Sequence, residues 1–224
     1  MKKLVIVLSL VVGVASAAHA QTSRFGVKAG VSLSNVTGND ASAGTFKSQL
    51  GLQAGAMADI SFSRRLAFHP ELLFSQKGAK IDGGASYTSG AGTYVSSQMG
   101  RVRLAYLDLP LLLRVQAAGV FFEVGPQLGL LLSREFDKNT TTVVTYTGAT
   151  GSVITTQNEA SRGTDGARKL DVGYVLGVGY RLPQGLELGL RYNGGLAKLA
   201  DGNSAPELHN SVFQLQVGYL FGTQ

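Results

Sequence analysis

The chain has no cysteine and no tryptophan, and only 15% of its 224 residues are charged, against about 25% in an ordinary soluble domain. Without cysteine, a disulfide framework and a thiolate metal site are both excluded. The longest apolar run, residues 4–18, is shorter than the roughly 20 residues that a membrane-spanning helix needs. The formal net charge of +6 is small and spread along the chain, which argues against nucleic-acid binding.

The apolar run near the start of the chain is typical of an export signal. Lys2 and Lys3 precede it, and Ala18-His19-Ala20 follows it as a cleavage site of the small-x-small type. We therefore expect residues 1–20 to be a signal peptide and residues 21–224 to form one exported domain.

Glycine is abundant, with 30 residues, and apolar residues alternate with polar residues or glycine along much of the chain. Because successive side chains of a strand point to opposite faces, this alternation predicts strands with one apolar face. Most of these segments have ten or more residues, which matches the 9–11 residues that a tilted strand needs to cross a bilayer. Eight segments show the pattern: 25–34, 48–61, 66–78, 101–116, 120–133, 169–181, 186–198 and 210–221.

Short and long connections alternate between these segments. This is typical of outer-membrane barrels, which have tight periplasmic turns and longer extracellular loops. We predict an all-β fold: an eight-stranded antiparallel up-and-down transmembrane β-barrel with both termini on the periplasmic side. Residues 87–95 and 143–156 have the composition of hairpins. They would either extend above the membrane and present tyrosine and threonine to a partner, or be variable surface loops that bind nothing. The short connections are 62–65, 117–119 and 182–185, and the long ones are 35–47, 79–100, 134–168 and 199–209.

The non-apolar faces of the segments carry both charged residues and glycines. The interior of an eight-stranded barrel holds only some side chains, so glycines leave room for long charged groups that must pair with one another. Lys169 also lies on the non-apolar face of its segment. Pro110 lies between Asp108 and Arg114. A bulge at Pro110 would change the face on which these two residues lie, and we expect both of them to point inward. The predicted lumen network is Lys28, Asp59, His69, Glu71, Asp108, Arg114, Glu123, Asp171, Glu187 and Arg191.

The apolar faces would then contact membrane lipid, with aromatic residues in the headgroup region at the strand ends. The last segment, 214–221, resembles the C-terminal signal by which barrel-assembly machinery recognises outer-membrane barrels. Residues 222–224 follow the final aromatic residue, whereas many such signals end on it. The aromatic residues near strand ends are Phe25, Phe62, Phe74, Tyr180, Tyr192, Tyr219 and Phe221.

Two neighbouring motifs carry a family resemblance. Residues 106–114 read Tyr-Leu-Asp-Leu-Pro-Leu-Leu-Leu-Arg, and residues 125–129 read Gly-Pro-Gln-Leu-Gly. Together with the opening segment 25–30 (Phe-Gly-Val-Lys-Ala-Gly), they resemble the PorT-type outer-membrane barrels, often labelled porin-family proteins. The resemblance implies an eight-stranded barrel in the outer membrane of a Gram-negative bacterium, and it implies no particular activity.

Few residues point to chemistry. His209 and Ser211 have the His-x-Ser spacing of lipid A deacylases, but Val212 stands where that family has asparagine. His69 and Glu71 share a face and would form a proton-sensitive pair or a plain part of the lumen network. Two histidines beyond the signal peptide, with no cysteine, do not make a convincing metal site. We expect no catalysis, no cofactor and no metal.

The resulting expectation is a small integral outer-membrane barrel, structural or loop-presenting, with a largely plugged lumen. Three alternatives stay open at this point. They are a narrow passive porin for small polar solutes, a lipid-modifying barrel enzyme that uses His209 and Ser211, and a soluble periplasmic ligand-binding barrel.

Overall fold

The computed structural model describes residues 23–38, 46–148, 150–164, 167–199 and 207–221. The expected signal peptide, residues 1–20, lies outside the described residues, as do residues 222–224. The described part of the chain contains no helix long and apolar enough to cross a membrane. Its strands are β1 (Ser23–Thr37), β2 (Phe46–Ser61), β3 (Leu66–Ser89), β4 (Gly92–Ala117), β5 (Val120–Tyr146), β6 (Ser152–Arg162), β7 (Leu170–Arg181), β8 (Leu186–Gly195) and β9 (His209–Leu220).

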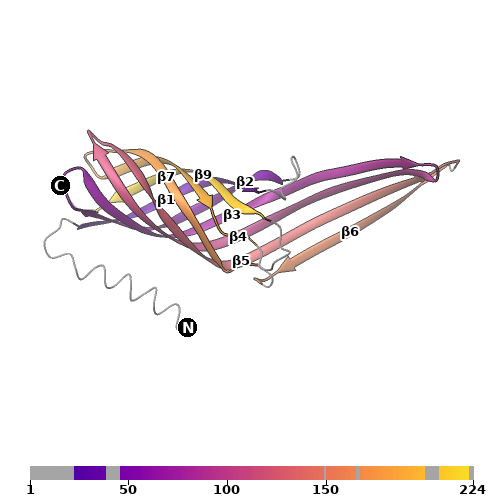
Figure 1. Ribbon diagram of the computed structural model, residues 1–224, viewed down its shortest axis with the longest axis horizontal. Helices are drawn as coiled ribbons and strands as arrows, with labels where there is room; N and C mark the ends of the chain where they lie inside the picture. Colours follow the sequence, from indigo (N-terminus) through magenta and orange to yellow (C-terminus); the bar gives the residue numbers. More distant parts are fainter. Residues whose placement is uncertain (1–22, 39–45, 149, 165–166, 200–206, 222–224) are drawn as a thin grey trace.

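Eight of these strands close into an antiparallel barrel (Figure 1). The order around the ring is β1, β2, β3, β4, β5, β7, β8 and β9, and β9 pairs with β1 to complete it. Consecutive ring strands run up and down, so a closed sheet with no free edge results. The predicted eight-stranded up-and-down barrel is confirmed.

Three ring strands continue beyond the barrel and, together with β6, form a four-stranded part of the same sheet, which we call the extension. It consists of residues 79–89 of β3, 92–105 of β4, 133–146 of β5 and the whole of β6. Figure 1 shows the extension projecting from one end of the barrel. Residues 79–100 and 134–168, expected as connections, are therefore largely strand. Their threonines, valines and tyrosines favour extended backbone, and the expected hairpins 87–95 and 143–156 lie within the extension.

The tight turns lie at the opposite end of the barrel from the extension. In the β4–β5 turn, Ala118 and Gly119 have φ angles of 49° and 85°. Two consecutive residues with positive φ are the signature of a type I′ turn, whose twist matches that of the strands it joins. The other two turns, 62–65 and 182–185, connect β2 to β3 and β7 to β8.

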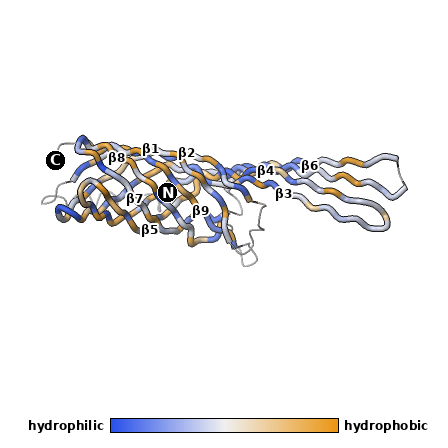
Figure 2. Tube along the Cα trace, turned by 90° about the horizontal axis from the view of Figure 1, so that it is seen from above, coloured by the Kyte–Doolittle hydropathy of each residue, from blue (hydrophilic) through white to orange (hydrophobic). Residues whose placement is uncertain are grey.

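The barrel carries its apolar side chains outside and its polar side chains inside. Phe25 and Phe213 are each 62% exposed, whereas Glu71 and Arg191, inside the ring, are 2% and 3% exposed. Hydrophobic and hydrophilic positions alternate along the barrel strands (Figure 2). A soluble ligand-binding barrel would place its leucines and phenylalanines in the centre, so this arrangement fits a barrel surrounded by lipid.

The aromatic residues expected at strand ends lie on the outer surface. Phe25, Phe62, Phe74, Tyr180, Tyr219 and Phe221 are exposed, and Tyr192 is half-buried. The Tyr192 ring contacts that of Phe213, with ring centroids 4.9 Å apart.

Pro110 does not shift the sheet register. The same register joins β3 to β4 from Leu66↔Val115 to Ser89↔Gly92, with a gap in the pairing at Leu109 and Pro110, since proline has no N–H group to donate to the ladder. The bulge in this region lies instead between β4 and β5, where the register shifts between Ala105 and Tyr106. Asp108, Pro110 and Arg114 are all buried inside the ring.

Candidate functional site

The lumen is filled by charged side chains drawn from seven of the eight barrel strands. Six basic groups face six carboxylates, and most of them are fully buried. The structure places all ten residues of the predicted lumen network inside the barrel, and we refer to the set of paired charges as the lumen network. Its basic members are Arg24, Lys28, Lys77, Arg114, Arg181 and Arg191, and its acidic members are Asp59, Glu71, Asp108, Glu123, Asp171 and Glu187.

Arg191 of β8 stands at the centre of the network. Its Nη1 and Nη2 donate to the two oxygens of Glu71 on β3, at 2.7 and 2.9 Å. Its Nε donates to Oε1 of Glu123 on β5 at 2.9 Å, and Lys28 Nζ of β1 lies 2.5 Å from Glu71 Oε1. Four strands on different sides of the ring are thus joined across the lumen by charge-assisted hydrogen bonds, which are stronger than neutral ones.

A second group continues toward the tight turns. Arg114 Nη1 donates to Glu187 Oε1 at 2.7 Å, and its Nη2 donates to Glu123 Oε2 at 3.0 Å. The guanidinium also lies 4.1 Å from the centroid of the Phe121 ring. Arg181 Nε reaches Glu187 Oε1 at 2.6 Å, and its Nη2 pairs with Asp59. Arg114 therefore connects this group to the central one through Glu123.

A third group lies toward the extension. Lys77 Nζ lies 3.1 Å from Asp108 Oδ1 and 3.4 Å from Asp171 Oδ2. Asn210 of β9 donates to Asp171 Oδ2 at 2.9 Å, and Lys77 lies 4.5 Å from the centroid of the Tyr106 ring. These contacts join β3, β4, β7 and β9 at the end of the lumen nearer the extension.

Glycines on the inward face leave room for these side chains. A Cβ atom added at Gly177 would lie 2.7 Å from Glu123 Oε1, and one at Gly129 would lie 2.6 Å from Asp108 Oδ1. Both distances are shorter than van der Waals contact, so the charged groups occupy the volume that larger side chains would need. This is the role that the alternation of charges and glycines indicates in the sequence.

Three members of the network escaped the sequence prediction, and one expected position was wrong. Lys77 lies on the same face of segment 66–78 as His69, and Arg181 lies on the same face of segment 169–181 as Asp171. The alternation rule therefore finds both when it is applied along the whole of each segment. Arg24 precedes the first expected segment. Lys169 lies just before the start of β7 and is exposed, because the inward alternation begins only at Asp171.

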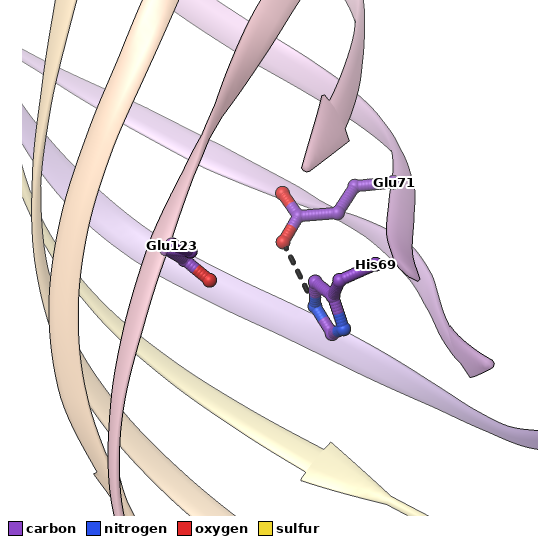
Figure 3. Close-up of side chains that lie close together, drawn as sticks. All are labelled: His69, Glu71 and Glu123. Carbon is purple, nitrogen blue, oxygen red and sulfur yellow. Dashed lines mark ion pairs between the residues drawn. The ribbon is translucent and has the colours of Figure 1, made fainter. Parts of the chain in front are cut away.

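His69, Glu71 and Glu123 bring three potential metal-ligating atoms within 4.8 Å of one another. In Figure 3 the three side chains point toward the same space, with Nε2 of His69 3.1 Å from Glu71 Oε1. Arg114 Nη2 lies 3.0 Å from the same nitrogen. Both carboxylates are already paired with Arg191, so a metal ion would compete with a guanidinium for them. We therefore assign the cluster to the lumen network.

His209 and Ser211, the candidate catalytic pair, lie at the start of β9 and outside the lumen. His209 Nδ1 lies 3.1 Å from the Ala197 carbonyl oxygen. The Ser211 hydroxyl lies 3.2 Å from the Tyr192 hydroxyl. Within the described residues, no hydrogen bond joins the imidazole to the serine.

Comparison with known proteins places the chain in a family. The family model described as "Outer membrane protein beta-barrel domain" matches residues 19–201. No curated protein sequence matches the chain.

Three solved structures are similar over most of the chain. Ail of Yersinia pestis shares 11% identity, with 89% of this chain and 99% of that chain covered and a TM-score of 0.44. OprG of Pseudomonas aeruginosa shares 14% identity, with 91% and 98% covered and a TM-score of 0.35. Neisserial surface protein A shares 15% identity, with 89% and 99% covered and a TM-score of 0.35. The chain belongs to the outer membrane protein beta-barrel domain family, and it is an integral protein of the Gram-negative outer membrane.

Proposed function

We propose that this protein is a closed scaffold that holds the extension at the cell surface, and that it neither conducts solutes nor catalyses a reaction. The observation that carries the proposal is the lumen network, which spans the interior from wall to wall. The side chains of Arg114 and Arg191 are 0% exposed. Because a channel needs a continuous aqueous path, these crossed ion pairs block conduction.

The cost of opening the lumen supports this proposal. Removing one partner of a buried ion pair costs about 3–5 kcal/mol, because the other charge is left unpaired in a medium of low dielectric. Arg191 and Arg114 each pair with two carboxylates. A passing solute would have to displace several such contacts at once, which raises the free energy of passage through the lumen.

The extension supplies the surface that such a scaffold would present. Tight turns of outer-membrane barrels face the periplasm, so the extension lies on the extracellular side. The β3–β4 ladder runs from the tight turn at 62–65 to the tip without a change of register, so the barrel wall and the tip belong to one sheet. Tyr87 and Tyr94 stack there, with ring centroids 4.7 Å apart. Exposed segments on a rigid scaffold are suited to recognition of a partner.

Three finer assignments are part of the proposal. The motifs at 106–114 and 125–129 support membership of the PorT-type group within the family. Outward-facing Tyr219 and Phe221 at the end of the chain support insertion by barrel-assembly machinery through β9. Val212 in place of asparagine, together with the separate hydrogen-bond partners of His209 and Ser211, supports a non-enzymatic role.

Planar-bilayer recording of the purified, refolded protein tests the closed lumen. We expect no steady unitary current, because the ion pairs leave no aqueous path. A matched variant, Arg114→Ala with Arg191→Ala, removes both central guanidinium groups and should produce small, steady currents. A shift in gel mobility on heating shows that each sample is folded before recording. Reproducible unitary currents from the unaltered protein would instead identify a narrow porin.

A further inference from the structure

A recess lies at the base of the extension; most of its lining residues face outward, and it also reaches the buried Gln49 and Lys77. It has a volume of about 770 Å³. Leu50 of β2 and Phe74 of β3 line its apolar side and are 74% and 43% exposed. Lys80, Arg101 and Arg103 line its other side. Because Leu50 and Phe74 belong to the outward-facing set, the recess opens toward the membrane.

The recess spans the level at which the wall changes from apolar to charged. Along β3 the outward positions pass from Leu72 and Phe74 to Lys80, and along β4 they pass from Leu107 to Arg103 and Arg101. The apolar band of a membrane barrel marks the hydrocarbon region. The basic residues therefore lie where the headgroups of the outer leaflet begin.

Positive charges are placed side by side at this level. Lys47, Lys80 and Arg101 occupy directly opposite positions on β2, β3 and β4. Like charges directly opposite each other destabilise a sheet unless something neutralises them. Lys47 is neutralised, because it forms an ion pair with Asp82.

The remaining carboxylates do not neutralise Lys80 and Arg101. Glu135 is shared by Arg103 at 3.4 Å and Arg162 at 3.1 Å. Asp137 lies opposite Arg101 in the ladder, but it forms no ion pair with it. Across the described part of the chain, neither Lys80 nor Arg101 has a carboxylate partner within 4.0 Å. Two adjacent cations thus stand at the rim of the recess without a carboxylate partner among the described residues.

We propose that this recess binds a phosphorylated lipid of the outer leaflet. The phosphate lies between Lys80 and Arg101, and an acyl chain lies along Leu50 and Phe74. Phosphate suits the position because a guanidinium and an ammonium both donate strong hydrogen bonds to its oxygens. The apolar half of the recess favours a lipid over a free phosphate ion, since an acyl chain packs against Leu50 and Phe74 and a free ion does not.

Lipid binding to the full-length protein in neutral detergent micelles tests the proposal. Native mass spectrometry would count bound molecules of diphosphoryl lipid A and of the same lipid A with both phosphates removed. We expect the phosphorylated form to bind at least about tenfold more tightly, which is the effect expected from one or two charge-assisted hydrogen bonds. Sodium chloride should reduce this preference, because the cations are partly exposed and are therefore screened.

Variants connect the preference to the recess. Lys80→Gln combined with Arg101→Gln should abolish the preference, whereas Lys80→Arg should keep it. The matched control, Lys138→Gln with Lys169→Gln, removes two cations outside the recess and should leave the preference unchanged. All of these positions are on the surface, and the gel shift on heating checks that each variant is folded.

Three results would overturn the proposal. The first is equal binding of the phosphorylated and dephosphorylated lipids. The second is a preference that survives Lys80→Gln with Arg101→Gln. The third is full displacement of lipid A by millimolar inorganic phosphate, which would show that the site takes a free anion. None of these results depends on whether the lumen conducts, so the proposal can fail while the closed-scaffold function stands.

Discussion

Replacing Arg191 by methionine should cause a large loss of stability. Methionine has a roughly similar volume but no charge, so the change removes the hydrogen bonds to Glu71 and Glu123 without creating a large cavity. Glu71 keeps Lys28 and Glu123 keeps Arg114, yet six carboxylates then face five basic groups in the lumen. We expect the free energy of unfolding to fall by about 3–5 kcal/mol, the usual result of leaving a buried charge unpaired.

The measurement is urea unfolding in lipid vesicles or micelles. The chain has no tryptophan, so the folded fraction is best followed by far-ultraviolet circular dichroism and by gel mobility without heating. Arg162→Met is the matched control. Arg162 pairs with Glu135, but its side chain is 83% exposed, so its loss should cost less than about 1 kcal/mol.

A double variant sharpens the test. Adding Glu123→Gln to Arg191→Met restores the balance of charge in the lumen. The double variant should therefore be more stable than the sum of the two single effects indicates, by about 1–3 kcal/mol. If Arg191→Met costs no more than Arg162→Met, the lumen charges are screened by water, and the argument for a closed lumen fails.

Further predictions concern glycine, topology and catalysis. Gly177→Ala should lower stability by about 1–3 kcal/mol through a clash with Glu123, whereas Gly90→Ala, with nothing within 4 Å, should change it little in the same unfolding assay. Proteinase K added to intact cells should cut the β5–β6 connection at 147–151 but not the turn at 182–185. Mass spectrometry of the fragments identifies the cleavage sites. The opposite pattern would show that the barrel is oriented the other way in the membrane. Expression of either the unaltered protein or the Ser211→Ala variant should leave the acyl chains of lipid A unchanged. Mass spectra that show loss of an acyl chain only with Ser211 present would establish an enzyme.

The membrane part of the fold was predictable because a single rule governs it. In a strand between lipid and a filled lumen, successive residues face lipid and lumen in turn. The positions of Phe25 and Lys28 in the sequence therefore already predict that Phe25 faces lipid and Lys28 faces the lumen. The same rule places Asp108 and Arg114 on one side of β4, and it would have found Lys77 and Arg181. It does not find the bulge between Ala105 and Tyr106, because a bulge depends on packing between strands.

The pairing of the charges could not be predicted. Glu71 meets Lys28 and Arg191, which are 43 and 120 positions away in the sequence. These contacts follow from the ring order and from the stagger of eight strands, and alternation within one strand contains neither. The candidate lipid site was hidden for the same reason, since Lys80 and Arg101 become neighbours only through the β3–β4 register.

The extension was underestimated because its residues have no apolar face. Residues 139–142 read Asn-Thr-Thr-Thr, a composition that indicates a loop when amphipathic alternation is the criterion. Outside the membrane no such alternation is required, because both faces of the sheet meet water. Hydrogen bonding to neighbouring strands and the β preference of threonine are sufficient there.

The unbroken β3–β4 register limits how this surface can change during evolution. A single residue inserted into one strand would turn every later side chain of that strand to the opposite face. The change of face would extend along the strand as far as the barrel wall. Matched insertions or deletions of two residues in both strands preserve the facing of each position. The extension can therefore lengthen or shorten by two residues in each strand at a time, while the sequence of the barrel wall stays the same.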